Sequence, residues 1–205
     1  MTLQHTFQEL IQSYDNDASS ADRLWKEIER QYNAASRHYH TLHHLEQMYA
    51  WLIPLKPHIV HWEPVVFAVF YHDLVYEASS GKNEENSAEI ARQRLRDIGV
   101  PEQTISQTYE LILATKKHAI SDNPDINYFT DADLGILGQD WPTYHHYLKS
   151  IRKEYAVYPD FLYNIGRKQV LQHFLKMERI FKTPYFSERF ENQARQNLQQ
   201  ELNDL

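Results

Sequence analysis

The segment PVVFAVFYHD, residues 64–73, decides the fold class of this chain. Up to Tyr71 its residues are apolar on nearly every side of a helix, so the segment predicts a buried helix. Proline at its start is typical of a first helical turn. The run ends in His72 and Asp73, and a buried aspartate needs a hydrogen-bonded partner or a bound cation. A hydrogen bond between these two side chains in the core is the alternative to a metal site.

Helix signals of the same kind continue on both sides of this segment. Serine and threonine precede amphipathic runs, prolines begin or end them, and no run alternates with the period of two that a strand requires. No repeat, linker or change of composition marks a domain boundary, so we predict one all-α domain over residues 1–205, with about eight to ten helices. The expected helices cover residues 22–32, 40–52, 64–76, 83–99, a run after residue 101, and residues 130–137, 140–155, 159–181 and 187–205.

Charge and hydropathy exclude several classes of protein. The chain has 28 Asp or Glu and 21 Lys or Arg residues, a formal net charge of -7, which disfavours binding to a nucleic-acid polymer or an anionic membrane. The longest apolar stretch, residues 65–71, is far shorter than the roughly 20 residues of a membrane-spanning helix. The first residues lack the basic start and apolar run of a secretory signal. We therefore expect a cytoplasmic protein.

Cysteine and glycine are scarce, whereas histidine is abundant. Because the chain has no cysteine, it cannot form a disulfide, a thiolate nucleophile or a cysteine-based metal site. Its five glycines form no phosphate-binding loop of either common type. Metal chemistry would therefore have to use histidine and carboxylate side chains, and many of the twelve histidines are bunched.

The segment RHYHTLHH, residues 37–44, is the densest of these bunches. His40 and His44 are spaced four residues apart, which on a helix stacks both rings on one face, with His43 close to it. The two rings can then address one metal ion or one substrate. The alternative is a solvated, histidine-rich start of a helix.

The segment TDADLGILG, residues 130–138, offers two carboxylates. Asp131 suits the first turn of a helix capped by Thr130, where a negative charge is favourable. Asp133 leads directly into apolar residues, so we expect it to point inward.

Taken in order, His44, the pair His72-Asp73 and Asp133 resemble the His…His-Asp…Asp signature of the HD superfamily of metal-dependent phosphohydrolases. The resemblance implies an HD-type helical bundle in which these four residues hold a metal ion. It favours Asp133 over Asp131 as the last ligand without excluding Asp131.

The context of these residues extends the resemblance over about residues 30–180. Tyr39-His40 followed by His44 is similar to the Tyr-His-x-x-x-His motif of the cyclic-nucleotide phosphodiesterase branch, in which the first histidine is the proton donor. A bacterial group described as predicted metal-dependent HD phosphohydrolases is similar in the order of HDLVY (72–76), NEENSA (83–88), DADL (131–134) and IRKEY (151–155).

Mixed nitrogen and oxygen ligands suit Mn²⁺, Fe²⁺, Co²⁺, Ni²⁺ or Zn²⁺, with Mg²⁺ as a further alternative. Water activated by the metal would then attack a nucleotide or another small phosphate ester, so we predict hydrolysis of a phosphoric ester or anhydride. His40 is expected to protonate the leaving oxygen, or His43 if the helix is rotated. Glu84 or Glu85 can orient the water, although charge at a helix N-terminus also explains both.

Cationic side chains are also expected to bind the phosphate. Arg37 and Arg152 can grip it with two parallel hydrogen bonds. Lys117 and His118, together with Lys116, end a helix, where lysines also complement the helix dipole. His118 can alternatively support a second metal ion.

Two rival functions stay open at this point. An HD-type di-iron oxygenase would need extra ligands, for which His118 and His43 are the candidates. A non-catalytic regulatory protein that binds a metal or nucleotide would keep the ligands without turnover.

The last helix, expected over residues 187–205, packs on the core or forms a homodimer contact.

Overall fold

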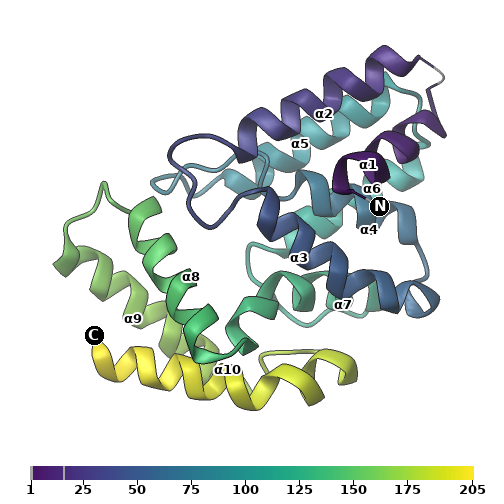
Figure 1. Cartoon of the computed structure of the whole chain (residues 1–205). Coiled ribbons are helices and arrows are strands. Elements are labelled where there is room, and N and C mark those ends of the chain that lie inside the picture. The colour runs from purple at the N-terminus through teal and green to yellow at the C-terminus, as the bar shows by residue number, and fades with distance from the viewer. Residues whose placement is uncertain (1, 16) are drawn as a thin grey trace.

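The computed structural model describes residues 2–15 and 17–205, and this part of the chain is all-helical, without a strand (Figure 1). The predicted all-α fold class is therefore confirmed. The α-helices are α1 (Leu3–Gln12), α2 (Ala18–Tyr32), α3 (Leu42–Leu52), α4 (Trp62–Tyr71), α5 (Asn83–Asp97), α6 (Glu102–Ala114), α7 (Pro124–Asp133), α8 (Trp141–Glu154), α9 (Asp160–Lys176) and α10 (Pro184–Asp204). Two short 3₁₀ helices are η1 (Ile53–His58) and η2 (Leu134–Gly138).

Helix α4 forms the centre of the core, as its apolar sequence predicts. Every residue from Pro64 to Tyr71 is buried, and the helix packs against α3, α5, α6 and α7. Phe7 of α1 covers its end, with the ring edge-on to Phe70 and the centroids 4.7 Å apart. Burying an all-round apolar helix in this way is the main hydrophobic gain available to the sequence.

Helices α8, α9 and α10 lie together on one side of the molecule, at the lower left of Figure 1. Tyr144 of α8 and Arg167 of α9 both donate hydrogen bonds to the Glu201 carboxylate of α10, which ties the three helices together. Helix α10 also packs closely on η2. A Cβ atom on Gly138 of η2 would lie 2.3 Å from Phe190 Cβ, so only glycine allows this approach.

The observed helix bounds differ from the predicted ones in several places, and the helix expected over residues 64–76 already ends at Tyr71. The patterns above do not predict α1, which the side chain of Thr2 caps. Helix α7 begins at Pro124 because the Asn123 side chain caps it, so Asp131 lies in its last turn and not in a first turn. Helix α9 ends at Lys176, short of the predicted residue 181.

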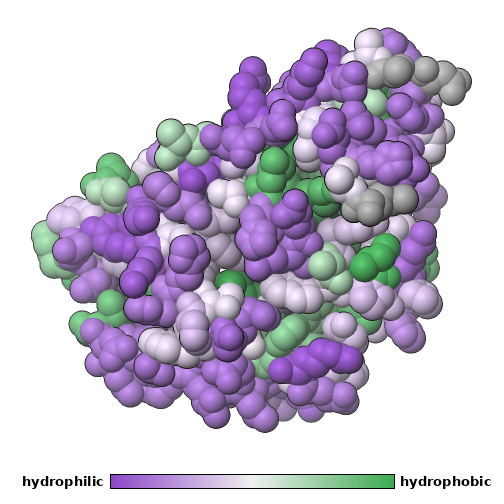
Figure 2. Space-filling model, in the orientation of Figure 1, coloured by the Kyte–Doolittle hydropathy of each residue, from purple (hydrophilic) through white to green (hydrophobic). Residues whose placement is uncertain are grey.

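The surface in Figure 2 is mostly hydrophilic, with apolar side chains at its left edge, in the region of α9. The exposed large hydrophobic residues there are Val157, Phe161, Leu162, Ile165 and Val170. Among the described residues, none of the helices combines the length and apolar character needed to cross a membrane.

Candidate metal centre

Three side chains from separate helices bring their ligand atoms together. His44 lies in the first turn of α3, His72 directly follows α4, and Asp133 is the last residue of α7. The Nε2 atoms of His44 and His72 are 3.3 Å apart, and Asp133 Oδ1 lies 3.1 Å from the first and 3.7 Å from the second. One ligand atom from each residue lies within 4.8 Å of the others, so this group could hold a metal ion.

Asp73 adds a second carboxylate at the same point. Its Oδ2 lies 3.1 Å from His72 Nε2 and 3.9 Å from His44 Nε2. The side chains of Asp73 and Asp133 are only 17% and 15% exposed. In the described part of the chain their ion-pair partners are all histidines, with no lysine or arginine. Two poorly solvated carboxylates without a permanently charged partner attract a cation.

The donor set fits a metal ion. His72 Nδ1 lies 3.1 Å from the carbonyl oxygen of Val69. Because a carbonyl oxygen can only accept, Nδ1 carries the hydrogen and Nε2 of the neutral ring keeps its lone pair for a metal. Metal–nitrogen bonds are about 2.0–2.1 Å long, so neighbouring ligands of one ion lie about 3 Å apart. The nitrogen–nitrogen and nitrogen–oxygen separations given above are of this size.

The pKa values of these groups reflect burial and their mutual charges. Burial lowers the pKa of His44. Burial also acts to lower the pKa of His72, but the charge of Asp73 and its hydrogen bond outweigh this effect and raise the pKa to about 9. Burial acts to raise the pKa of Asp73 and Asp133, but neighbouring histidines hold both values below the usual range. Both carboxylates are thus ionised at neutral pH, as metal ligands must be, and metal binding at His72 would displace its proton.

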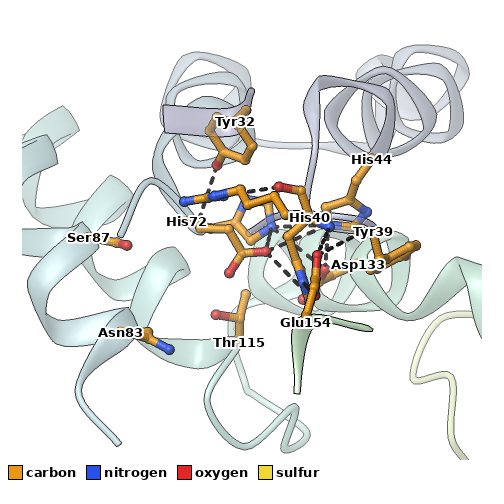
Figure 3. Close-up of polar contacts among 12 residues, drawn as sticks. Tyr32, Tyr39, His40, His44, His72, Asn83, Ser87, Thr115, Asp133 and Glu154 are labelled. Atoms are coloured by element: carbon orange, nitrogen blue, oxygen red, sulfur yellow. Dashed lines mark hydrogen bonds and ion pairs between the residues drawn. The ribbon is translucent and has the colours of Figure 1, made fainter. Parts of the chain in front are cut away.

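His40 lies beside this group and is held by Glu154, the last residue of α8 (Figure 3). His40 Nδ1 is 2.7 Å from Glu154 Oε2, while His40 Nε2 lies 3.9 Å from Asp73 Oδ2. The other carboxylate oxygen, Oε1, accepts hydrogen bonds from the backbone N–H groups of residues 38, 39 and 40 at 2.7, 2.7 and 3.0 Å. Glu154 therefore fixes both the backbone and the ring of His40.

The prediction that His40 and His44 lie on one face of the same helix is wrong. Helix α3 begins at Leu42, so His40 precedes it. The backbone N–H groups before α3 bond to Glu154 instead of to helical carbonyl groups. His43, the alternative proton donor, has a side chain that is 73% exposed and lies 3.3 Å from Glu46.

The two aspartates of α7 have different surroundings. Asp131 is fully buried, and its carboxylate accepts hydrogen bonds from the backbone N–H groups of Lys182 and Thr183 at 2.9 and 2.8 Å. It thereby anchors the segment that leads into α10. Asp133 turns the other way, with Oδ1 toward His44 and Oδ2 2.9 Å from His118 Nε2.

His118 reaches the site from the turn that follows α6. Its φ angle is 48°, in the left-handed region that few residues other than glycine adopt. The turn closes with the His118 N–H bonded to the carbonyl oxygen of Ala114, and the ring of His118 contacts Asp133. The structure therefore brings His118 to the metal-ligand group. The sequence analysis named it as a candidate for binding phosphate or for supporting a second metal ion.

A cavity of about 660 Å³ opens over this site. The ionisable side chains that line it include His40, Asp73, Glu84, His118 and Asp133. Glu84 lies in the first turn of α5 and lines this cavity, and its role in orienting water stays a prediction. Glu85, the alternative, pairs with Lys116, whose Nζ also lies 3.8 Å from Glu84 Oε2.

The three basic residues predicted to bind phosphate are not among the described residues that line this cavity. Arg37 is buried, and its Nη atoms donate to the carbonyl oxygens of His40 and Leu74 at 3.1 and 2.9 Å. It therefore joins the two chain segments that carry His40 and Asp73. Arg152 donates to carbonyl oxygens in the turn after α8, and Lys117 is exposed.

Glu154 is the site residue that sequence reasoning missed. Its contact with His40 spans 114 positions, and within its own helix it stands in a charged IRKE run typical of a solvated surface. The one available signal was the presence of this run in the resemblance noted above. No family model, curated protein or solved structure matches the chain.

Proposed function

We propose that this chain is a metal-dependent hydrolase of phosphate esters or anhydrides. One observation carries the proposal: donor atoms of His44, His72 and Asp133 lie within 4.8 Å of one another, and Asp133 lines the cavity. The resemblance of the same residues, with Asp73, to the HD signature supports it from the sequence side. In this proposal these four residues hold the ion.

A divalent ion at this place supplies two things, a lower pKa for bound water and polarisation of a phosphoryl oxygen. Nitrogen and carboxylate ligands favour Mn²⁺, Fe²⁺, Co²⁺, Ni²⁺ or Zn²⁺, and Mg²⁺ is the hard-ion alternative. The chain supplies the remaining groups from its own residues. Thr115, Asn83 and Glu84 line the cavity and offer hydrogen bonds to substrate or water.

His40 acts in this proposal as the acid that protonates the leaving oxygen. Burial acts to lower the pKa of His40, but the charge of Asp73 and the hydrogen bond to Glu154 raise it above its usual value. The raised pKa favours the protonated ring, which lines the cavity. Glu154 is the positioning residue, because the hydrogen bond from His40 Nδ1 to its carboxylate keeps the imidazole ring from rotating.

Metal content is the first test of this function. The chain is purified without chelator, and bound metal is counted by elemental analysis in the wild type, in Asp73→Ala and in Asp122→Ala. Asp122 is exposed and serves as the matched control. We expect about one ion per chain in the wild type and control and none in Asp73→Ala.

Hydrolysis of phosphate esters is then measured with the same proteins and with His40→Ala. We expect His40→Ala to keep its metal and to lose about 10²–10⁴-fold in kcat, the usual contribution of a general acid. Absence of metal in all proteins, even after addition of Mn²⁺, would contradict the proposal. Two irons per chain with consumption of O₂ would indicate an oxygenase, and metal binding without turnover would indicate a regulatory protein.

A further inference from the structure

The cavity over the metal-ligand group has aromatic walls. Tyrosines from four segments of the chain line it, namely Tyr76, Tyr147, Tyr155, Tyr158 and Tyr163. The Tyr76 ring also lies against the His40 ring, tilted by 32° with the centroids 4.2 Å apart. Flat aromatic surfaces bind other flat ring systems by stacking, and each such contact contributes about 1–3 kcal/mol.

The cavity offers almost no free positive charge. Arg167 is the one lysine or arginine among its described lining residues. Its Nε and Nη2 atoms donate to both oxygens of Glu201 at 2.6 and 2.9 Å, and its side chain is 9% exposed. Lys116, near Glu84, is held by Glu85 and by the carbonyl oxygen of Gly81. Neither cation is available to a substrate.

The nearby arginines instead support the tyrosine walls from behind. Arg152 lies 4.8 Å from the ring centroid of Tyr163. Arg37 and Arg167 lie 5.6 and 5.5 Å from the centroids of Tyr76 and Tyr147. Because these guanidinium groups are also hydrogen-bonded to protein atoms, they order the walls.

Apart from the histidines His40 and His118, the charged side chains left on the lining are carboxylates. Asp73, Asp133 and Glu84 face the cavity, and Glu84 Oε2 lies 3.8 Å from Lys116 Nζ. The ion and the His40 cation of the proposed mechanism balance these carboxylates, which leaves little positive charge for a substrate beyond the ion itself. The positive charge of the ion matches a single phosphoryl group bound next to it. Each further phosphoryl group of a polyphosphate would add negative charge close to carboxylates without a compensating cation.

The mouth of the cavity is apolar. Leu162 and Val170 of α9 line it and are 47% and 42% exposed. Large exposed apolar side chains beside a binding cavity are covered when an apolar ligand enters. At about 660 Å³ the cavity has room for a ring system of nucleoside size beside a phosphate.

We propose that the site accepts phosphate monoesters with an uncharged, planar aromatic body and discriminates against polyphosphates. This inference rests on the proposed function, which by itself leaves esters, anhydrides, mono- and polyphosphates equally open. Nucleoside monophosphates and simple aryl phosphates share the required chemistry.

Four probes test this proposal at a fixed concentration of free Mn²⁺. They are adenosine 5′-monophosphate, phenyl phosphate, glycerol phosphate and adenosine 5′-triphosphate. Hydrolysis is measured with the wild type, and binding by calorimetry with His40→Ala, in which turnover is expected to be slow. We expect kcat/KM and affinity to be about tenfold or more higher for each aromatic monophosphate than for glycerol phosphate. We also expect both quantities to be higher for adenosine 5′-monophosphate than for adenosine 5′-triphosphate.

A gain-of-function variant tests the charge argument. Gln169 is an exposed residue of α9 that lines the cavity, so Gln169→Lys places an unpaired cation there. We expect it to improve triphosphate binding relative to monophosphate binding by up to about fivefold, the size of an exposed ion pair. Gln200→Lys, on an exposed part of α10 outside the cavity, makes the same charge change and should leave the ratio unchanged.

The outcomes separate this inference from the proposed function. Equal or better use of glycerol phosphate or the triphosphate overturns the inference, while the hydrolase proposal stands. Selective binding of the aromatic monophosphates without hydrolysis of any probe supports the inference and overturns the hydrolase. Failure of all four probes to bind the metal-loaded chain overturns the inference.

Discussion

Glu154 stabilises the site through one carboxylate, and its removal is the sharpest test of the structure. The carboxylate accepts three backbone N–H bonds and faces His40 Nδ1 at 2.7 Å. A hydrogen bond to a charged group contributes about 1.5–3 kcal/mol, and an unsatisfied buried donor costs about 1–3 kcal/mol. Water can reach residues 38–40 in part, because residues 38 and 40 are not buried. We therefore expect Glu154→Ala to lower the free energy of unfolding by about 3–5 kcal/mol.

Glu154→Gln separates the roles of shape and charge. The glutamine oxygen can still accept the backbone N–H groups, but its amide nitrogen can only donate, so His40 Nδ1 must lose its hydrogen and the ring becomes the neutral Nε2–H tautomer. We expect a smaller loss of about 1–2 kcal/mol. Urea unfolding of the metal-free proteins measures both variants, with Glu188→Ala, an exposed residue of α10, as control. A Glu154→Ala protein as stable as this control would refute the reasoning.

The same contact predicts how stability depends on pH. Burial acts to raise the pKa of Glu154, but hydrogen bonds from His40 and the backbone lower it from 4.5 to about 2. A carboxylate with a lowered pKa stabilises the fold fully above its unfolded value and loses this contribution as the pH falls. The stability difference between wild type and Glu154→Gln should therefore be present above about pH 4.5 and shrink toward pH 2. A difference that grows as the pH falls would contradict the assignment.

Two further pairs of variants test the packing and the ligands. Gly138→Ala should lower the free energy of unfolding by about 1–3 kcal/mol, because its Cβ would lie 2.3 Å from Phe190 Cβ. The Cβ of Gly81→Ala meets no atom within 4 Å, so this control should change little. Equal melting temperatures of the two variants would count against the close contact. Asp133→Asn should abolish metal binding and leave the fold intact, as seen by calorimetry and circular dichroism. Asp131→Asn should do the reverse, with metal retained and about 1–3 kcal/mol of stability lost; loss of metal in a folded Asp131→Asn protein would contradict the division between them.

The sequence predicts the parts of this fold that local chemistry determines. The buried helix at residues 64–71 follows from its all-apolar composition, and Asp133 points inward because apolar residues follow it. The position of His40 could not be predicted in this way. Its four-residue spacing from His44 favours a helix, but three N–H bonds to Glu154 hold the backbone in another conformation. A contact across 114 positions leaves no local signal in the sequence.

Arg37 and Arg152 illustrate the same limit for charge. Their residue type suits phosphate, but the structure engages them with carbonyl oxygens and with the faces of tyrosine rings. Whether an arginine binds a ligand or supports a wall depends on which groups its fold places within reach. Composition alone does not contain that information.

The ligand atoms and the cavity walls come from different parts of the chain. His44, His72 and Asp133 lie at the ends of α3, α4 and α7, around the central buried helix, whereas much of the tyrosine wall comes from α8, α9 and the turn between them. Helix ends packed against a rigid core hold ligands at fixed separations, as a metal requires. The largely exposed α9 has only Leu171 fully buried, so its cavity-facing residues can change with little cost to the core. Substitutions on α9 should therefore alter substrate preference while metal affinity stays constant, and substitutions at the three helix ends should do the opposite.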